Sequence, residues 1–411
     1  MSANHSSTNT SVSEHMQSGL PTIPDTPVWR NRTLLAISLA VCVTYIGLSM
    51  VTPIRVLYAE QQGASLTIIS MMANAFLISN FAFQFPAGWL SDKLGHKRLM
   101  IIGLILQAIL TIIYLVITDP ILFIVLRFLE GMVGAAVAPA GRALVIEAVP
   151  EHQRGEAFGI FGAALNVGFL LGPGLGGLLG YTNTFIGSVV TRLIGLVLII
   201  TLVKGGISHK ITQTKQKTKL PLHMLFPLGL IGAYVIAFGD YLFLGFDQTV
   251  MPIWLHNDLG ATVTVVGIIY MLWSVPNIIL SPLGGRLADR LSRKWIILVG
   301  GLLQVPLYMA YGLANSATLV GILFVIHGAV YGLMLPALDA HVATSSTANT
   351  RAQIQGLYNM FGFMGAFVGS TLFLPLYHLN FRLPLVVNGI GYGISILIGC
   401  LIIFASQRKR A

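Results

Sequence analysis

The chain has 411 residues, 55% of them hydrophobic and only 9% charged, whereas an average soluble domain has about 25% charged residues. This composition excludes an ordinary water-soluble globular protein, because so few charged groups cannot cover a surface that faces water. A net charge of +10 would suit a nucleic-acid partner, but the positions of the basic residues indicate a membrane instead.

A membrane-spanning helix needs about 20 apolar residues, and the chain carries twelve such segments separated by short polar turns. Because backbone polar groups in lipid must be satisfied within the segment, we expect each one to be a helix. The expected helices lie at residues 34–58, 68–91, 97–118, 120–146, 157–180, 182–203, 223–251, 262–284, 295–315, 318–345, 350–376 and 383–405.

The basic residues predict the orientation of these helices. With an even number of spans, both chain ends lie on one side, and most of the 24 Lys and Arg residues lie there too. Loops rich in Lys and Arg stay in the cytoplasm, so we expect a multi-pass plasma membrane protein with both termini inside. The expected organisation is a disordered tail over 1–30, a six-helix bundle over 31–203, a Lys-rich linker over 204–222, a second six-helix bundle over 223–405 and a basic tail over 406–411.

Two polar hinges between apolar segments are nearly the same string. Residues 88–98 read GWLSDKLGHKR and residues 285–294 read GRLADRLSRK, with Asp92 and Asp289 197 positions apart. The same offset relates glycine, proline and arginine positions over the following helices. Two homologous halves are therefore predicted, and one known transporter plan places its substrate site between two such parallel repeats, near the membrane midplane.

Three motifs resemble those of the major facilitator superfamily. The first hinge, from Gly88 to Arg98, is similar to the loop 2–3 signature of that family, although Ser292 replaces the corresponding glycine in the second hinge. The segment RFLEGMVGA from Arg127 is similar to the family motif in helix four, with Glu130 where a glutamine is usual. The resemblance implies an all-α membrane protein of twelve transmembrane helices in two homologous halves.

The third motif lies in the fifth predicted helix and resembles the antiporter signature of proton-driven efflux proteins. Its residues are Gly168, Gly172, Pro173, Gly176 and Gly177. Small residues let helices pack closely, and the proline removes a backbone hydrogen bond and bends the helix. The alternative interpretation is ordinary tight packing.

The resemblance implies that the hinge carboxylate Asp92 is a gating residue, which pairs with a basic residue in one conformation only. The alternative is a solvated charge in a basic loop. The expected gating residues are Gly88, Asp92, Lys93, Gly95, Lys97, Arg98, Gly285, Asp289 and Arg290.

Arg127 and Glu130 are three positions apart on one face of a predicted span. Each charge costs at least ~2.5 kcal/mol there, so such residues usually face the bundle interior and serve function. The alternative is a structural ion pair. In the second half His327 is equivalent to Glu130, and it is either a titratable site residue or a packing histidine.

Asp240 and Asp247 are seven positions apart, on one face of the seventh predicted helix. A lone buried carboxylate takes up a proton more readily than it stays charged. We hypothesise that Glu130 and Asp240 carry a coupling proton, with Asp247 as a helper or a contact for a cationic substrate. Asp247 could equally be a water-exposed residue near the outer mouth.

The predicted function is secondary active transport, as proton-coupled efflux of lipophilic or cationic small molecules by alternating access. Alternatives are a dedicated exporter of a metabolite, siderophore or lipid, and a non-transporting membrane sensor. Zinc-protease and phosphate-loop motifs are absent from the sequence, so we expect no enzyme, no cofactor and no metal. The expected partners are a small-molecule substrate, protons and the bilayer, without nucleic acid, and we expect a monomer.

Overall fold

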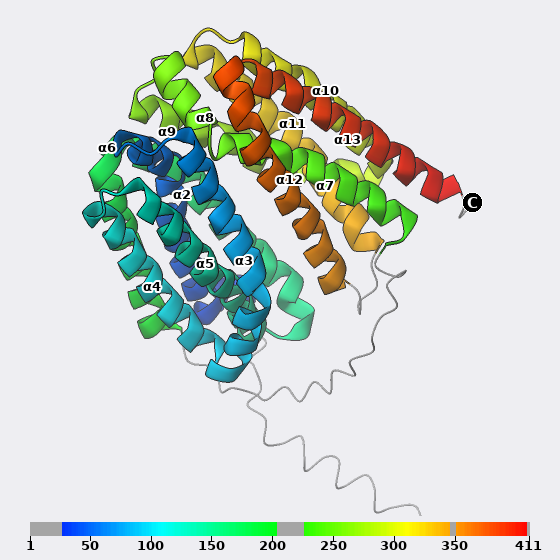
Figure 1. Ribbon diagram of the computed structural model, residues 1–411. Coiled ribbons are helices and arrows are strands. Elements are labelled where there is room, and N and C mark those ends of the chain that lie inside the picture. The colour runs from blue at the N-terminus through cyan, green and yellow to red at the C-terminus, as the bar shows by residue number, and fades with distance from the viewer. Residues whose placement is uncertain (1–26, 204–225, 346–350, 409–411) are drawn as a thin grey trace, which may run out of the picture.

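A computed structural model of the chain describes residues 27–203, 226–345 and 351–408, and these are helical almost throughout (Figure 1). The predicted terminal tails and linker fall largely outside these ranges, although a short turn, η1, already forms at Val28–Arg30. The long helices are α2 (Arg32–Gln61), α3 (Leu66–Leu94), α4 (His96–Val116), α5 (Pro120–Ala148), α6 (Arg154–Leu202), α7 (Leu228–Asp247), α9 (Val263–Arg290), α10 (Arg293–Leu313), α11 (Ala317–Thr344), α12 (Arg351–Leu379) and α13 (Leu383–Arg408).

Eleven helices within the described residues are long and apolar enough to cross a membrane. One of them, α6, has 49 residues and bends at Gly180, where φ is 75° and ψ is −164°. A positive φ suits glycine because it has no Cβ atom. The Thr184 hydroxyl donates to the Gly176 carbonyl beside the bend, at 2.7 Å. Because α6 therefore spans the membrane twice, the prediction of twelve transmembrane helices is confirmed.

The seventh transmembrane helix ends less regularly than the sequence predicted. Helix α7 stops at Asp247, and a short helix α8 (Met251–Ile253) and a π-helical turn η4 (Trp254–Asp258) continue the chain. The indole of Trp254 is fully buried in this turn. Such a turn alters the direction of the backbone without exposing apolar surface, which a hydrophobicity pattern does not predict.

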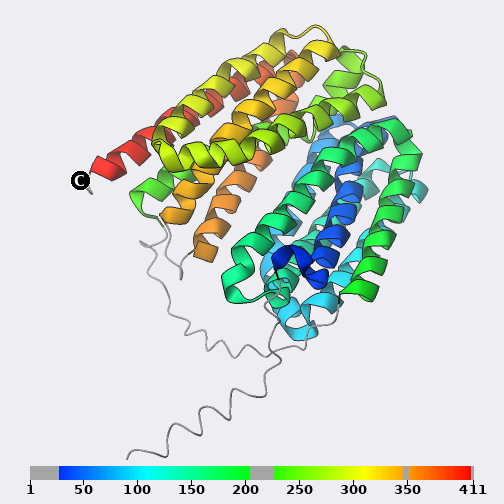
Figure 2. The same ribbon diagram turned by 180° about the vertical axis from the view of Figure 1, so that it is seen from behind.

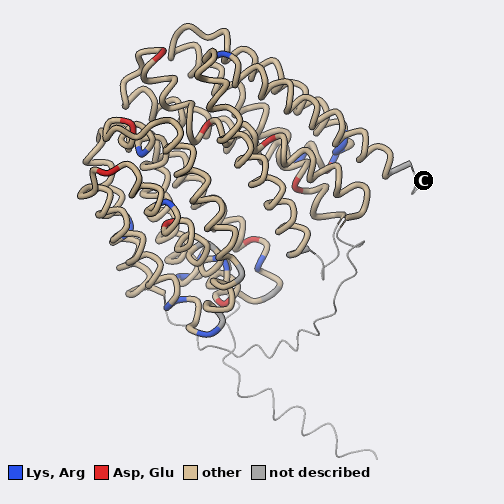
Figure 3. The backbone as a smooth tube through the Cα atoms, in the orientation of Figure 1, with Lys and Arg blue, Asp and Glu red and all other residues tan. Residues whose placement is uncertain are grey.

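The helices form two groups, α2–α6 and α7–α13, which diverge toward the side where α2 begins and α13 ends (Figures 1 and 2). Figure 3 shows few charged positions along most of the helix lengths. Among the described residues, every hydrogen bond between the two groups involves the ends of helices on the opposite side. We call that side the closed end and the side where α2 begins the open end.

One contact at the closed end joins α3 to α12 through polar side chains. The Ser70 hydroxyl donates to the Ser370 carbonyl at 2.8 Å, and the Ser370 hydroxyl donates to Asn74 Oδ1 at 2.5 Å. Asn74 Nδ2 donates to Thr371 Oγ1 at 3.1 Å. We call this set the polar crossing.

The other contact joins α6 to α9 through glycines. A Cβ atom built on Gly267 would lie 2.3 Å from the Pro173 carbonyl oxygen and 2.8 Å from Gly177 Cα. One built on Gly174 would lie 2.8 Å from Met271 Sδ. The two backbones therefore meet without intervening side chains, and we call this set the glycine crossing.

The two crossings are equivalent positions of the internal repeat. Adding 197 to Ser70 gives Gly267, and adding it to Pro173 gives Ser370. In one contact the Ser370 carbonyl of α12 faces Ser70, and in the other the Pro173 carbonyl of α6 faces the equivalent residue Gly267. The two halves are thus related by a pseudo-twofold axis. Polar side chains form the contact on one side of this axis, and glycines form the contact on the other side.

Candidate functional site

A cavity of about 440 Å³ lies between the two groups of helices and is called the central cavity. Residues of both groups form its wall, but the second group supplies most of them. The lining residues are Ser49, Thr52, Pro53, Asn166, Phe169, Pro173, Asp240, Tyr241, Phe243, Leu244, Asp247, Gln248, Tyr270, Trp273, Ser274, Asn277, Ile278, Tyr308, Phe324, His327, Tyr331 and Leu335. The volume suits a drug-sized molecule.

The two carboxylates of α7 both line the central cavity. Asp240 is only 9% exposed, and the Tyr331 hydroxyl of α11 donates to its Oδ2 at 3.0 Å. Asp247 is half-buried, and the Tyr270 hydroxyl of α9 donates to its backbone carbonyl at 2.6 Å. Tyr331 thus holds the side chain of Asp240, and Tyr270 lies against Asp247, interacting with both its backbone carbonyl and its carboxylate.

The remaining wall is aromatic or polar and neutral. The rings of Trp273 and Tyr331 lie 5.5 Å apart between centroids. The first half contributes hydroxyl and amide groups and the ring of Phe169. No Lys or Arg is among the lining residues that the structure describes, so the charged groups of this wall are acidic.

His327 lines the same cavity, but both of its ring nitrogens are engaged. Its Nε2 lies 3.2 Å from Gln304 Oε1, and its Nδ1 lies 3.0 Å from the Tyr311 hydroxyl. Gln304 uses its amide nitrogen to donate to the Gly300 carbonyl, so its oxygen accepts from Nε2 and Tyr311 donates to Nδ1. This pattern satisfies a neutral imidazole and matches the packing alternative for His327.

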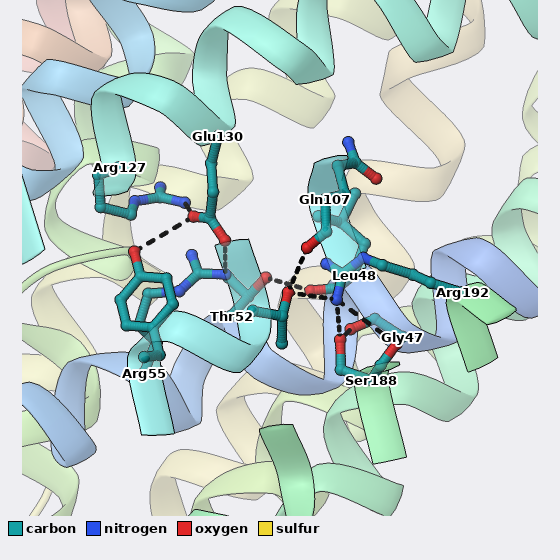
Figure 4. Close-up of polar contacts among 11 residues, drawn as sticks. Gly47, Leu48, Thr52, Arg55, Gln107, Arg127, Glu130, Ser188 and Arg192 are labelled. Carbon is teal, nitrogen blue, oxygen red and sulfur yellow. Dashed lines mark hydrogen bonds and ion pairs between the residues drawn. The ribbon is translucent and has the colours of Figure 1, made fainter. Parts of the chain in front are cut away.

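Arg127 and Glu130 meet as their spacing predicted, but neither lines the central cavity. Arg127 Nη1 donates to Glu130 Oε2 at 3.0 Å, and Arg55 Nη2 lies 3.5 Å from Glu130 Oε1. The Tyr114 hydroxyl donates to Oε2 at 3.3 Å. Figure 4 shows these side chains converging from α2, α4 and α5.

A third arginine, Arg192 of α6, completes what we call the arginine cluster: Arg55, Arg127 and Arg192 around Glu130. Arg192 is 2% exposed and donates to the Thr111 hydroxyl at 2.8 Å and to the Ser188 hydroxyl. Neither Arg55 nor Arg192 is among the site residues predicted from the sequence. The repeat offers one signal for the site, because Tyr114 with Glu130 is equivalent to Tyr311 with His327.

Hydrogen bonds attach the first hinge, residues 88–98, to the first group of helices. Gly95 has a φ of 89°, which favours glycine, whereas Ser292 at the equivalent place has a φ of −70°. Lys97 Nζ donates to the carbonyls of Ile200 and Val203, at 3.1 and 2.5 Å. It thereby satisfies acceptors at the carboxyl end of α6.

The other gating residues lie at the open end. Lys93 and Arg98 are exposed, and Lys93 Nζ stands 5.0 Å from the Trp89 ring. In the second hinge Arg290 is exposed, and Asp289 is 77% exposed and 4.0 Å from Arg293. The side chain of Asp92 lies outside the described residues. Cβ atoms built on Gly88 and Gly285 would have nothing within 4 Å, so this conformation has no close helix approach there.

The glycines of the third motif have two different neighbours. Gly168, Gly172 and Gly176 face α2: Cβ atoms there would lie 2.7 Å from Tyr45 Cβ, 1.8 Å from Ser49 Oγ and 2.2 Å from the Met50 carbonyl oxygen. Pro173 and Gly177 instead face α9 in the glycine crossing. One run of small residues therefore packs α6 within its half and also against the other half.

We expect Gly267→Ala to open the closed end more often. The new methyl group needs about an ångström more room beside the Pro173 carbonyl than the 2.3 Å available. The measurement is the labelling of a cysteine placed at Phe169, in the cavity wall, by a membrane-impermeant maleimide added to intact cells. We expect the labelling rate to rise several-fold.

This experiment uses a chain in which the native Cys42 and Cys400 are replaced by alanine. Gly162→Ala in α6 is the matched control, because its Cβ atom would have nothing within 4 Å. Equal labelling rates in the Gly267 and Gly162 variants would contradict a role of the glycine crossing in closure.

The chain matches the Major Facilitator Superfamily over residues 37–246 and 230–411. Together with the two-half fold and the central cavity, this match shows that the chain belongs to that superfamily of membrane transporters. It is therefore a multi-pass transporter of small molecules and not an enzyme.

Similar proteins include drug-resistance proteins. Multidrug resistance protein 2 of Bacillus subtilis (strain 168) is 24% identical over 389 residues, covering 89% of this chain and 95% of that protein. Quinolone resistance protein NorA of Staphylococcus aureus (strain Mu50) is 22% identical over 396 residues, covering 93% and 98%.

Solved structures share the fold at lower identity. A bacterial homolog of the human lysosomal transporter Spinster, in an inward-facing and unoccupied conformation, has a TM-score of 0.73 and 15% identity, covering 92% of this chain and 98% of that one. A D-xylose-proton symporter has a TM-score of 0.69 and 16% identity, covering 92% and 96%. At identities of 15% and 16% these likenesses concern the fold alone.

Proposed function

We propose that the protein exports lipophilic, cationic small molecules in exchange for protons. The observation that carries this proposal is the charge of the central cavity, which holds Asp240 and Asp247 among aromatic rings and lacks Lys and Arg among its described lining residues. Aromatic faces and carboxylates both attract cations. The names of the drug-resistance relatives support the same substrate class.

In this proposal Asp240 is the principal proton carrier. It is buried, it faces the cavity, and among the described residues its side chain accepts a hydrogen bond from a neutral hydroxyl, that of Tyr331. Proton uptake removes its charge and therefore its attraction for a bound cation. Proton and substrate thus compete for one group, which is what exchange requires. Asp247, nearer the closed end of α7, is a second contact for the cation.

The part of Glu130 in proton transfer stays a prediction. Its carboxylate is held by Arg55, Arg127 and Tyr114 outside the cavity wall, and these partners favour the ionised form over the protonated one. We therefore propose that Glu130 positions Arg55, Arg127 and Tyr114 within the first half. The exchange of protons is assigned to Asp240 of α7.

We further propose that both termini lie in the cytoplasm and that the protein works as a monomer in the plasma membrane. The basic hinges support this orientation, because Lys and Arg concentrate in cytoplasmic loops. The open end then faces the cytoplasm, and the closed end with its two crossings faces outward. This is the conformation from which an exporter takes up its cargo.

The test is substrate-induced proton release. Purified protein in detergent, with a pH-sensitive dye in weak buffer, is titrated with lipophilic cations such as tetraphenylphosphonium and, separately, with neutral and anionic drugs. We expect cations alone to release protons, in a saturable manner. Binding of the cation without any proton release would exclude the proposed exchange, and release by anions would exclude the proposed charge selectivity.

A further inference from the structure

The arginine cluster contains more positive than negative charge. Arg55, Arg127 and Arg192 are 5%, 8% and 2% exposed, and Glu130 is 7% exposed. Glu130 interacts electrostatically with all three guanidinium groups, and in the part of the chain that the structure describes it is the carboxylate that pairs with them. Arginine stays protonated in proteins. Two positive charges therefore lie uncompensated inside a membrane protein, where an unpaired charge is costly.

The cluster has buried hydrogen-bond donors for which no acceptor is present among the described residues. The Nε atoms of Arg55 and Arg192 are buried and have no hydrogen-bond partner among the described residues. The hydroxyls near them already donate elsewhere: Thr52 to the Leu48 carbonyl at 3.2 Å, Thr111 to the Gln107 carbonyl at 2.8 Å, and Ser188 to the Gly47 carbonyl at 2.5 Å. The missing group is thus a negatively charged acceptor that brings no proton of its own.

Arg55 and Arg192, whose Nε atoms have no hydrogen-bond partner among the described residues, point toward one place. Long side chains on a helix lean toward its amino end, and α2 and the second crossing of α6 are packed side by side through the Ser188–Gly47 hydrogen bond. Arg55 and Arg192 are close enough to repel one another electrostatically. In Figure 4 the side chain of Thr52 lies between them.

Access to this place comes from the central cavity. Thr52 lines that cavity, and Arg55 follows it by one turn of α2. None of the three arginines lines the cavity itself. We therefore expect a single small ion, and not a substrate-sized anion, to reach the arginines from the cavity beside Thr52.

We propose that a halide ion, such as chloride, binds between Arg55 and Arg192 beside Thr52 as a permanent part of the first half. A halide accepts hydrogen bonds, donates none, and neutralises one of the two excess charges. This site goes beyond the proposed export function, because it holds whether or not the cavity carries a cation.

The test measures the melting temperature of the purified, substrate-free protein in detergent. Chloride or bromide replaces gluconate at constant ionic strength, so that screening of surface charge is unchanged. A ligand that binds the folded state stabilises it by mass action. We expect a saturable rise of several degrees with either halide, and binding of about one radioactive chloride per chain that bromide displaces.

Arg192→Gln removes one of the two arginines and should abolish both the halide-dependent rise and the chloride binding. Arg142→Gln is the matched control, since Arg142 is exposed and outside the cluster. If Arg192→Gln yields too little folded protein, the chloride-binding measurement on the unaltered protein still tests the proposal. Equal melting in gluconate and chloride together with no bound chloride would overturn the proposal.

Discussion

We expect Asp240→Asn to abolish proton-driven uptake of a lipophilic cation by inverted membrane vesicles. Asparagine keeps the shape of the side chain and can still accept the Tyr331 hydrogen bond, but it can neither ionise nor carry a proton. The loss of one charged contact should weaken binding of the cation about tenfold, which is ~1.4 kcal/mol. Binding by the unaltered protein should also fall as the pH is lowered, whereas binding by the variant should depend less on pH, because Asp247 is then the one carboxylate left in the cavity wall among the described residues.

The control is Asp119→Asn, which removes a carboxylate outside the cavity. Asp119 caps the amino end of α5 by accepting from the Ile121 amide, and asparagine caps helices equally well. If Asp240→Asn retained full coupling, α7 would not be the site of proton exchange. Full coupling in both Asp240→Asn and Glu130→Gln would exclude the proposed proton carrier and also the second carrier that the sequence suggested.

The second large effect concerns stability. We expect Glu130→Ala to lower the melting temperature of the purified protein by about 5–10 °C, because it leaves three buried arginines without their carboxylate. Breaking a buried ion pair from one side costs about 3–5 kcal/mol, and a large domain loses about 2 °C for each kcal/mol. Thermal unfolding followed by intrinsic tryptophan fluorescence measures the shift.

The control for this variant is Glu156→Gln, which changes an exposed carboxylate in the first turn of α6. We expect it to melt within about one degree of the unaltered protein, since surface substitutions have small effects. A Glu130→Ala protein that melted normally would show that water or another group compensates the arginines. Normal melting with lost coupling would instead return Glu130 to the role of proton carrier.

The number of membrane crossings could be predicted from apolar length alone, because lipid requires every crossing to satisfy its own backbone. The break inside α6 was also predictable, since the expected segments ended at Gly180 and began again at 182. The irregular end of α7 was not, because an apolar run has the same composition whether it forms α-helical or π-helical turns. Trp254 stabilises that segment by burial, which the sequence does not display.

The candidate site could likewise be predicted from the sequence only in part. Asp240 and Asp247 could be placed on one face of a helix from their spacing, and the structure brings both to the central cavity. The spacing of Arg127 and Glu130 predicted their contact but not its distance from the cavity wall. Arg55, Tyr114 and Arg192 approach Glu130 from other helices, so only tertiary packing brings them together.

The two crossings of the closed end differ in how they meet external water. When the halves part there, the polar crossing exposes hydroxyl and amide groups that water can solvate and that can relay a proton. The glycine crossing exposes mainly apolar surface, and its polar contact is the Thr264 hydroxyl that donates to the Gly177 carbonyl. In the orientation proposed above, we therefore expect any proton leak between transport cycles to follow α3 and α12, at Ser70 and Asn74.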